Sequence, residues 1–372
     1  MSIPFIDLQR QYQQYRDEID AELREVLDSS RYIMGDKVEE IERKLAEFVG
    51  VEHGIGVASG TDALQLALMA MEIGPGDEVV TSPFTFIATA EVISLLGATP
   101  VFVDIKEETW NLDPAAVESV ISEDTAAVVS VDIFGQCADY DRLEEICDDN
   151  DLALIEDAAQ AFGASQDSKQ ACSFGDIACT SFYPAKPLGC YGDGGMVFTD
   201  DAGLADVIRS LRVHGEGQGR YEHTRVGINA RLDAMQAAVL LGKFPGFAEE
   251  IQHRQRIAAR YTDALAGTVS RTPVIRAGNK SAWAQYSVEV PERDKVRELL
   301  EEDEIPTCVF YPLPLHLQEA FSDLDYTEGD FPVCEAASGR IMSLPMHPFL
   351  EKETQNWIID RVQSAVEKAT GT

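Results

Sequence analysis

The chain has 372 residues, of which 45% are hydrophobic and 26% charged, values that are ordinary for globular proteins and exclude wholesale disorder. Its 65 acidic and 30 basic residues give a net charge of −35, which would repel nucleic acid and anionic membranes, so we expect neither as a partner. Only ten of the basic residues are Lys. A strongly acidic, Lys-poor surface is typical of proteins kept soluble by charge in concentrated salt; an acidic protein of ordinary surroundings is the alternative.

The seven cysteines form no C-x-x-C pair, and the six histidines do not cluster with them at zinc spacing. We therefore predict buried, reduced thiols and no metal site. The first ten residues become polar too early for a signal peptide, and no apolar run approaches the roughly 20 residues that cross a bilayer. We expect a cytoplasmic protein.

The first fifty residues are acidic and predicted to be largely helical, and they could pack on either domain. Beyond them, strand-like and helical patterns alternate, which predicts an α/β fold with a mostly parallel sheet and a site beyond the carboxyl ends of its strands. The predicted strands are Gly54–Ala58, Glu78–Thr81, Thr99–Asp104, Ala126–Val131, Leu152–Glu156, Ile177–Ser181 and Gly195–Phe198. The predicted helices are Thr61–Met71, Thr85–Leu96, Pro114–Ile121 and Tyr140–Asp148.

The pattern changes after residue 245. A charged helix is predicted over Phe247–Leu265, with short strands near Trp283–Val290 and a helix near Asp294–Glu302. We therefore predict a large domain of residues 1–245 and a smaller C-terminal α+β domain of residues 246–372.

The first predicted strand ends at a sequence suited to a phosphate. Gly60 and Thr61 open a helix, where free backbone N–H groups, a hydroxyl and the positive end of the helix dipole would meet an anion. An ordinary helix cap by Ser59 or Thr61 would explain the same residues.

Two later strand ends carry a carboxylate and a lysine. A buried carboxylate at Asp157 needs a cation or donors: a protonated pyridine nitrogen, an Arg or a helix N-terminus would each serve. Lys186 lies between two prolines, where a dry turn would favour the neutral amine and a Schiff base; a solvated loop lysine is the alternative. A phosphate cradle, a carboxylate for a ring nitrogen and an amine for an aldehyde together predict pyridoxal 5′-phosphate (PLP) as cofactor.

A series of motifs in fixed order carries a family resemblance. They are Phe5–Leu8, Ser59–Leu64, Gly74–Val79, Thr85–Ala90, Ile155–Gln160, Ser181–Lys186, Gly227–Asp233, Tyr311–His316 and Leu344–Met346. Over nearly its whole length the chain resembles the DegT/DnrJ/EryC1/StrS nucleotide-sugar aminotransferases. The resemblance implies their PLP-dependent, aspartate-aminotransferase-like (type I) fold.

The resemblance also implies the roles of residues around the cofactor ring. Lys186 would bind the aldehyde and then move the proton between the sugar carbon and the cofactor. Asp157 would keep the pyridine nitrogen protonated, and Gln160 would hydrogen-bond the phenolic oxygen. Phe86 would stack on the ring, although a core aromatic on a helix would look the same in the sequence.

The phosphate would be bound by Gly60, Thr61 and Ser181. In this family Asn229 reaches the phosphate from the neighbouring subunit, so the resemblance implies a functional homodimer with its active sites at the interface.

Four positions depart from the family's broad pattern: Asp132, Phe162 and Ala284, where many members have His, and Pro187, where many have Asn. The sequences around them resemble one branch, which uses glutamate to aminate C3 of UDP-2-acetamido-2-deoxy-3-keto-glucuronic acid. Asp132 fits the common pattern of the family less well, which leaves the chemistry of the nearby pocket open. The segments that resemble the branch are Gly135–Asp139, Phe162–Ser165, Lys186–Gly195 and Ala284–Tyr286.

A basic stretch in this acidic chain suits an anionic substrate, since guanidinium groups bind diphosphates and carboxylates; surface ion pairs are the alternative. Its members are Arg209, Arg212, His214, Arg220, His223, Arg225 and Arg231. Within the matched motifs, we expect Arg231, His316 and Tyr311 to bind substrate, with an ordinary capped-loop histidine as the alternative for His316.

The predicted reaction transfers an amino group from L-glutamate to a keto sugar nucleotide in two half-reactions, for surface polysaccharide or glycan biosynthesis. Amination at C4, or of a neutral 6-deoxy keto sugar on UDP or dTDP, is an alternative. PLP-dependent sugar dehydratases of the same fold carry His at the position of Lys186, so this lysine argues against them. A non-catalytic regulator that binds PLP or a nucleotide sugar is the alternative from another class.

Overall fold

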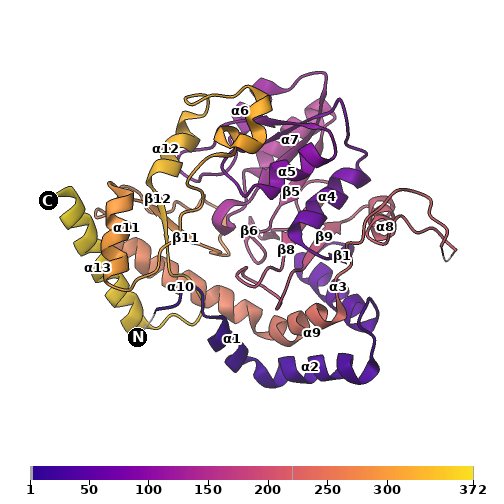
Figure 1. The fold of residues 1–372 in the computed structure, drawn as a ribbon, viewed down its shortest axis with the longest axis horizontal. Coiled ribbons are helices and arrows are strands. Elements are labelled where there is room, and N and C mark those ends of the chain that lie inside the picture. The colour runs from indigo at the N-terminus through magenta and orange to yellow at the C-terminus, as the bar shows by residue number, and fades with distance from the viewer. Residues whose placement is uncertain (1–2, 220, 372) are drawn as a thin grey trace.

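The computed structural model describes residues 3–219 and 221–371. Its centre is a seven-stranded sheet with strand order β1-β9-β8-β5-β4-β2-β3 (Figure 1). The strands from β8 to β3 pair in parallel, and β9 is antiparallel to both of its neighbours. The mostly parallel sheet predicted from the sequence is confirmed. The strands are β1 (His53–Val57), β2 (Glu78–Thr81), β3 (Thr99–Phe102), β4 (Thr125–Val131), β5 (Ala153–Asp157), β8 (Ile177–Ser181) and β9 (Gly195–Thr199).

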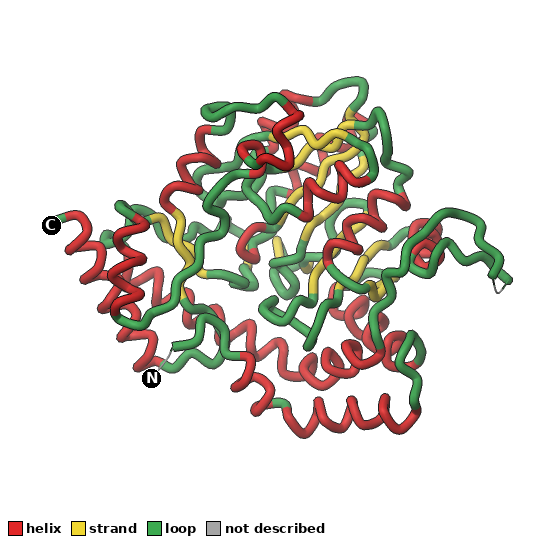
Figure 2. The backbone as a smooth tube through the Cα atoms, in the orientation of Figure 1, coloured by secondary structure: helices red, strands yellow, loops and turns green. Residues whose placement is uncertain are grey.

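Alternation of side chains along the strands divides the core into two faces. Ile155 and Cys179 belong to one hydrophobic cluster, and their neighbours Leu154 and Ala178 belong to the other. Helices cover both faces, as a buried parallel sheet requires (Figure 2). The first face packs under α4 (Gly60–Ala70), α5 (Ala88–Leu95) and α8 (Ala202–Leu211), and the second under α3 (Asp36–Val49), α6 (Pro114–Val120), α7 (Tyr140–Asn150) and α9 (Ala234–Lys243).

The strands and helices predicted between residues 54 and 199 are all present, with small differences at their ends. The largest difference is at α5, which was predicted from Thr85 but begins at Ala88. The chain first makes a turn in which the Ser82 hydroxyl accepts a hydrogen bond from the Phe84 N–H at 2.9 Å. This turn keeps Phe86 out of the helix.

The N-terminal helices α1 (Leu8–Gln14) and α2 (Arg16–Ser29) run along the edge of the molecule. Ile19 of α2 joins the core under α9, so closely that a Cβ on Gly242 would lie 2.8 Å from the Ile19 Cα. Gln11 of α1 instead donates to the Glu250 carboxylate of α10 (Phe247–Leu265) at 3.1 Å. The N-terminal segment thus packs mainly on the large sheet, and α1 extends it toward the C-terminal part.

The C-terminal part has its own small core, built around an antiparallel pair of strands. The proposed domain division at residue 246 falls in a short 3-10 helix, η2 (Phe244–Gly246). The core elements are α10 (Phe247–Leu265), β11 (Tyr286–Glu289), α11 (Arg293–Glu302), β12 (Ile341–Leu344) and α13 (Lys352–Thr370). The predicted helix Phe247–Leu265 is confirmed at both ends.

One C-terminal segment packs against the large sheet instead. The ring of Phe321 lies 5.7 Å from that of Phe102, and Asp104 accepts hydrogen bonds from the Val333 and Cys334 N–H groups at 2.9 Å. This packing brings Tyr311 and His316 toward the strand ends. The segment contains η3 (Leu315–Leu317), η4 (Glu319–Leu324) and α12 (Pro332–Arg340).

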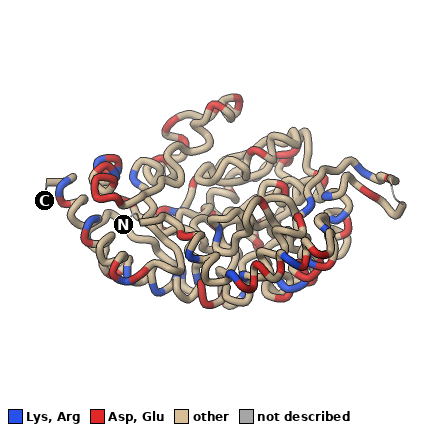
Figure 3. Tube along the Cα trace, turned by 60° about the horizontal axis from the view of Figure 1, so that its bottom comes forward, with Lys and Arg blue, Asp and Glu red and all other residues tan. Residues whose placement is uncertain are grey.

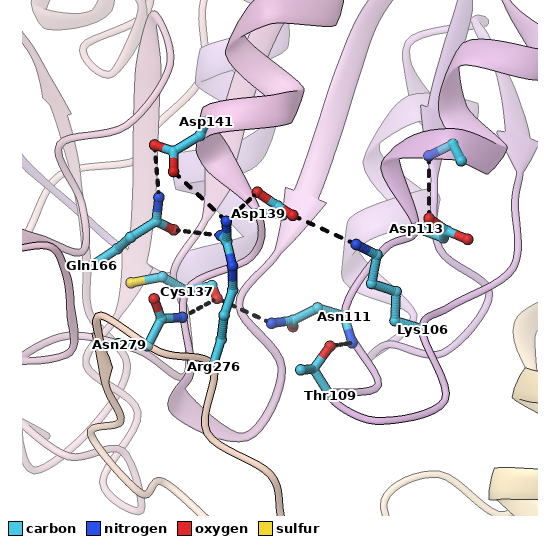
Figure 4. Close-up of polar contacts among 11 residues, drawn as sticks. Lys106, Thr109, Asn111, Asp113, Cys137, Asp139, Asp141, Gln166, Arg276 and Asn279 are labelled. Atoms are coloured by element: carbon cyan, nitrogen blue, oxygen red, sulfur yellow. Dashed lines mark hydrogen bonds and ion pairs between the residues drawn. The ribbon is translucent and has the colours of Figure 1, made fainter.

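A polar network ties the loop before β10 (Asn279–Lys280) to the large sheet (Figure 4). An Arg276 Nη lies 2.8 Å from an Asp139 carboxylate oxygen and 3.6 Å from one of Asp141. The Asn279 amide donates to the Cys137 carbonyl at 2.9 Å. The network holds the two parts together beside residues 132–139. The strand β10 extends a small sheet with β6 (Ser165–Gln166) and β7 (Lys169–Gln170).

All seven cysteines are free thiols, and all but Cys308 are buried. No helix in residues 3–219 and 221–371 is long and apolar enough to cross a membrane. Asp and Glu residues are spread along the helices rather than gathered in one patch (Figure 3).

Candidate active site

The end of β1 forms a cradle of small polar groups with the end of β8. Ser59 caps α4: its Oγ accepts from the Asp62 N–H at 3.0 Å and donates to the Asp62 carboxylate at 2.8 Å. The cap predicted as an alternative is therefore real, but it belongs to Ser59. Gly60 approaches Ser181 so closely that a Cβ there would lie 2.7 Å from the Ser181 Cβ. Thr61 follows in the first turn, whose N–H groups lack helical acceptors.

The end of β5 places the Asp157 carboxylate in the interior. Its Oδ2 accepts from the Thr89 hydroxyl at 2.8 Å, and its Oδ1 accepts from the Ala159 N–H at 3.2 Å. Burial raises the pKa of Asp157, while these two hydrogen bonds and the charge of Lys186 act in the opposite direction. One alternative that the sequence left open was an ion pair with an Arg. In the described part of the chain no Arg pairs with Asp157.

Lys186 lies in the turn after β8, and its backbone N–H donates to the Tyr183 carbonyl at 2.8 Å. Within residues 3–219 and 221–371 its side-chain Nζ has no hydrogen-bond or ion-pair partner. Burial lowers the pKa of Lys186 to about 8, although the charge of Asp157 opposes the shift. A partly buried amine with a lowered pKa and no partner is a ready nucleophile.

Gln160 is fixed at both ends of its amide. Its Oε1 accepts from the Phe134 backbone N–H at 2.8 Å, and its Nε2 donates to the Tyr311 hydroxyl at 3.2 Å. Because the oxygen is held by Phe134, the amide keeps Nε2 as the donor on the side of Tyr311. Burial and the charge of Asp157 raise the pKa of Tyr311, so its phenol is neutral.

Phe86 lies in the turn before α5 and exposes 56% of its surface. Its ring centre is 6.5 Å from that of Tyr311, with the planes tilted by 38°. The alternative of a core aromatic on a helix is therefore wrong. Phe86 presents an uncovered ring beside Tyr311, and hence near Gln160.

Arg231 and Asn229 lie on the chain that runs antiparallel to the end of β1. Arg231 forms a β-bridge with Val57, and the Ala58 N–H donates to the Ala230 carbonyl at 3.0 Å. Both contacts lie next to the cradle at the end of β1. The Arg231 guanidinium makes no ion pair within the part of the chain that the structure describes. Asn229 is exposed.

Other members of the basic stretch are engaged in structural contacts. Arg212 is buried, 2.5 Å from a Glu42 oxygen, and donates to the Gly56 carbonyl at 2.7 Å. Arg209 pairs with Asp206 at 3.2 Å. The alternative of a surface ion pair describes Arg209, whereas the ion pair of Arg212 lies in the interior. His223 lies with its Nδ1 3.0 Å from the His214 carbonyl, Arg225 is exposed, and Arg220 lies outside the described residues.

His316 was predicted to bind substrate, but its side chain is fully buried. Its Nε2 lies 3.1 Å from a Glu335 oxygen, and its ring packs edge-on against Phe331 at 4.7 Å. A direct substrate contact is not supported, because the imidazole faces the interior. The capped-loop alternative describes this residue better.

All four positions that depart from the family pattern are buried. The Asp132 Oδ1 accepts from the Ala138 N–H and the Tyr140 hydroxyl, each at 2.9 Å, on the face of the sheet opposite Asp157. Phe162 packs between other buried rings. Asp132 is therefore part of the interior rather than of the pocket that it had left in question.

Sequence reasoning missed two groups of this site, the Thr89 hydroxyl and the Phe134 backbone N–H. Thr89 stands four residues after Thr85 in a matched motif, and in a helix that began at Thr85, as predicted, this spacing would place the two hydroxyls one turn apart. In the structure Thr85 lies in the turn before α5. The Phe134 N–H carries no side-chain signal that a sequence could reveal.

Known proteins match the chain along its length. The model of the DegT/DnrJ/EryC1/StrS aminotransferase family matches residues 13–363. The UDP-2-acetamido-2-deoxy-3-oxo-D-glucuronate aminotransferase of Pseudomonas aeruginosa is 48% identical, over 94% of this chain and 96% of that protein. The pleiotropic regulatory protein of Geobacillus stearothermophilus is 44% identical, over 97% and 98%.

A solved structure is similar over the whole fold. It is a DegT DnrJ EryC1 StrS aminotransferase from Brucella abortus, with a TM-score of 0.95 and 45% sequence identity, covering 98% of this chain and 99% of that one. The predicted family resemblance and fold class are confirmed.

Proposed function

The chain belongs to the DegT/DnrJ/EryC1/StrS aminotransferase family, and from that premise we propose its reaction and substrate. It is a PLP-dependent aminotransferase. We propose that it moves the amino group of L-glutamate to C3 of UDP-2-acetamido-2-deoxy-3-keto-glucuronic acid, for surface polysaccharide or glycan biosynthesis. The observation that carries the proposal is the unpartnered Lys186 amine, with its lowered pKa, in the field of the buried Asp157 carboxylate.

The residues present fit PLP. Lys186 offers an amine without a partner in the described residues, and Asp157 offers a carboxylate held by donors. Gly60 lies so close to Ser181 that a side chain at position 60 would clash, and this contact sets the first turn of α4 beside the Ser181 hydroxyl. When bound, the cofactor supplies an electron sink for the carbon that loses or gains its proton. We assign the phosphate to the first turn of α4 with Ser181, where Thr61 adds a hydroxyl.

Lys186 is proposed to hold the cofactor aldehyde and then to act as the base and acid of both half-reactions. A pKa of about 8 leaves about a tenth of the amine neutral at pH 7, near the range in which proton transfer is efficient. Asp157 would keep the ring nitrogen protonated, and Gln160, oriented by Phe134, would donate toward the phenolic oxygen. Phe86 would cover the ring face.

We assign a homodimer with shared active sites. Asn229 is exposed, and the segment between α8 and α9 that leads to it projects from the body (Figure 1). Leu27 and Ile33 expose about half of their surfaces, and Ile33 pairs with Asp233 close to Arg231. A second copy would cover this apolar surface. Coexpression of Lys186→Ala and Asn229→Ala chains tests the sharing, because one site of each mixed dimer keeps both residues and should recover activity.

The ketouronate assignment is supported by the name of the Pseudomonas aeruginosa relative and by charge. A diphosphate and a carboxylate need cations, and Arg231 lacks an ion pair in the described residues although the chain has 65 acidic residues and only 30 basic ones. Tyr311 would add a neutral hydroxyl at the pocket.

A neutral keto sugar, or amination at C4, is the second candidate. The neutral-sugar alternative is tested with two 3-keto UDP sugars that differ only at C6, where one has a carboxylate and the other a hydroxymethyl group. A higher kcat/KM for the neutral sugar would overturn the ketouronate assignment, and turnover of a 4-keto sugar alone would overturn the assignment to C3.

The first experiment is the visible absorption spectrum of the protein with PLP, before and after L-glutamate. We expect a band of the lysine–cofactor Schiff base that glutamate bleaches and that Lys186→Ala lacks. Lys280→Ala, which removes an exposed lysine, is the matched control and should keep the band. A band indifferent to every amino donor would instead favour the non-catalytic regulator, the reading that the name of the Geobacillus relative suggests.

We also infer a cytoplasmic enzyme that works in concentrated salt. The free, mostly buried thiols suit a reducing compartment. With a net charge of −35, the acidic side chains repel one another unless ions screen them. Unfolding midpoints at about 0.1 M and about 2 M KCl test the second inference. A stability that does not rise with salt would favour the ordinary acidic protein.

A further inference from the structure

Two buried threonines stand behind the Asp157 carboxylate. The Thr89 hydroxyl lies 2.8 Å from Asp157 Oδ2, and the Thr85 hydroxyl lies 3.1 Å from that of Thr89. Both side chains are almost fully buried, at 2% and 1% exposure, so bulk water does not replace them. The three groups form a chain that leads from the turn before α5, through α5, to the end of β5.

The chemistry of the groups gives this chain a direction. An ionised carboxylate only accepts, so Thr89 donates its single hydroxyl proton to Asp157. The Thr89 oxygen is then free to accept, and Thr85 is the donor that faces it. Both protons therefore point toward Asp157, and each bond polarises and strengthens the next.

We propose that Thr89, supported by Thr85, is a positioning residue that keeps Asp157 ionised and oriented for the protonated ring nitrogen of the cofactor. The inference rests on the proposed PLP site. Thr89 touches neither cofactor nor substrate in this role and acts through Asp157. Without its donor, the carboxylate would keep only the longer 3.2 Å bond from the Ala159 N–H against the cost of burial.

The consequence is a dependence on pH. Burial already raises the pKa of Asp157, and the Thr89 hydrogen bond lowers it. Loss of that bond moves protonation of Asp157 to higher pH. A neutral acid cannot stabilise a pyridinium by charge, so cofactor affinity should fall at the acidic end of the range first.

Binding of pyridoxamine 5′-phosphate tests this inference without turnover, because this probe forms no Schiff base with Lys186. Its dissociation constant is measured from about pH 5 to about pH 9 for Thr89→Val, which keeps the side-chain shape, and for Thr89→Ser, which restores the hydroxyl. We expect Thr89→Val to weaken binding by about tenfold to a hundredfold at low pH and to move the inflection upward. Thr89→Ser should return the inflection, and Thr85→Val should shift it less.

Thr81→Val is the matched control. It also removes a buried threonine hydroxyl, here from strand β2, but that hydroxyl donates to the Val129 carbonyl at 2.9 Å. Its inflection should stay where the wild type has it. A loss of affinity in Thr89→Val by the same factor at every pH would reduce Thr89 to a packing residue and overturn the inference.

The outcomes separate this inference from the proposed function. A wild-type protein that binds neither PLP nor pyridoxamine 5′-phosphate would overturn both. A wild type that binds, with a Thr89→Val profile identical to its own, would overturn only the role of Thr89. If Thr89→Val does not fold, the smaller shift expected for Thr85→Val decides the question.

Discussion

Strand β5 carries two neighbouring buried carboxyl groups that face opposite sides of the sheet. Glu156 accepts hydrogen bonds from the Cys172 and Phe174 N–H groups at 2.7 and 2.9 Å and lies beside Asp132. Asp157 instead meets the Thr89 hydroxyl and the charge of Lys186. Burial raises the pKa of both groups, so burial alone does not distinguish a structural carboxyl from a functional one. The neighbours decide which it is.

The Glu156 side is closed. Asp132 Oδ2 is buried and makes no other hydrogen bond, and a proton on it would let it donate to Glu156. One proton shared by the two carboxyl groups would satisfy this side without a ligand. The Asp157 side stays open, because its lysine has no partner among the described residues. The Asp132–Glu156 pair can therefore be stabilised by a proton alone, whereas Asp157 can be stabilised by a cationic group of a ligand.

The sharpest test of this contrast exchanges each acid for its amide. Asp157→Asn should slow the glutamate half-reaction by about a hundredfold to a thousandfold, because it removes the buried charge that we propose keeps the ring nitrogen protonated. Glu156→Gln, one residue away in the same strand, should leave that rate within about threefold. Single-turnover absorbance after addition of glutamate measures both. Equal losses in the two variants would show that the two faces are coupled and that the contrast is wrong.

Arg231 tests whether a free charge on the open side has a use. Arg231→Ala should raise KM for the ketouronate nucleotide by about tenfold to a hundredfold, because a charged hydrogen bond is lost, with a smaller change in kcat. Arg209→Ala removes a guanidinium that pairs with Asp206 on the surface and serves as the control. A KM that stays at the wild-type value in Arg231→Ala would leave the substrate charge to another group.

Local signals in the sequence were enough for the sheet and the chemical groups, but not for the direction in which side chains point. The strand ends at Asp157 and Lys186 follow apolar runs, which are visible in one dimension. His316 looked like a site residue because its motif matched, and only packing against Phe331 and Glu335 turns it inward. The direction of the His316 side chain thus depends on tertiary packing, which hydrophobic periodicity in the sequence does not encode.

A comparison of two lysines shows the same limit of prediction from sequence. Lys243 is as buried as a site residue, and its pKa is also lowered to about 8 by burial. Its Nζ, however, donates to the Gly189 carbonyl and lies 5.3 Å from the centre of the Tyr191 ring. Scarcity and burial therefore do not single out Lys186. What does so is the missing partner, and this can be seen only in three dimensions.

The smallest predicted effect concerns the closed side of β5. Because burial raises the pKa values of Asp132 and Glu156, and the charge of Glu156 raises that of Asp132 further, the folded protein holds more protons than the unfolded chain. The pair is therefore tolerated best below the ordinary carboxyl pKa near 4, and stability is lost as pH rises from there through the raised values. Asp132→Asn keeps the shape and provides a permanent N–H donor for Glu156. It should reduce the pH-dependent loss in the free energy of unfolding by about 1–3 kcal/mol.

Urea unfolding at a series of pH values, in constant high salt to screen the surface, measures this slope. Glu40→Gln is the control, because its partner Lys44 lies on the surface and lowers the pKa of Glu40 instead. The control should leave the alkaline slope unchanged, since a lowered pKa costs stability only in acid. If Asp132→Asn also leaves the slope unchanged, the pair does not share a proton. The closed side would then be held by the backbone N–H groups of Cys172 and Phe174 alone, and the two faces of β5 would differ in partners but not in protonation.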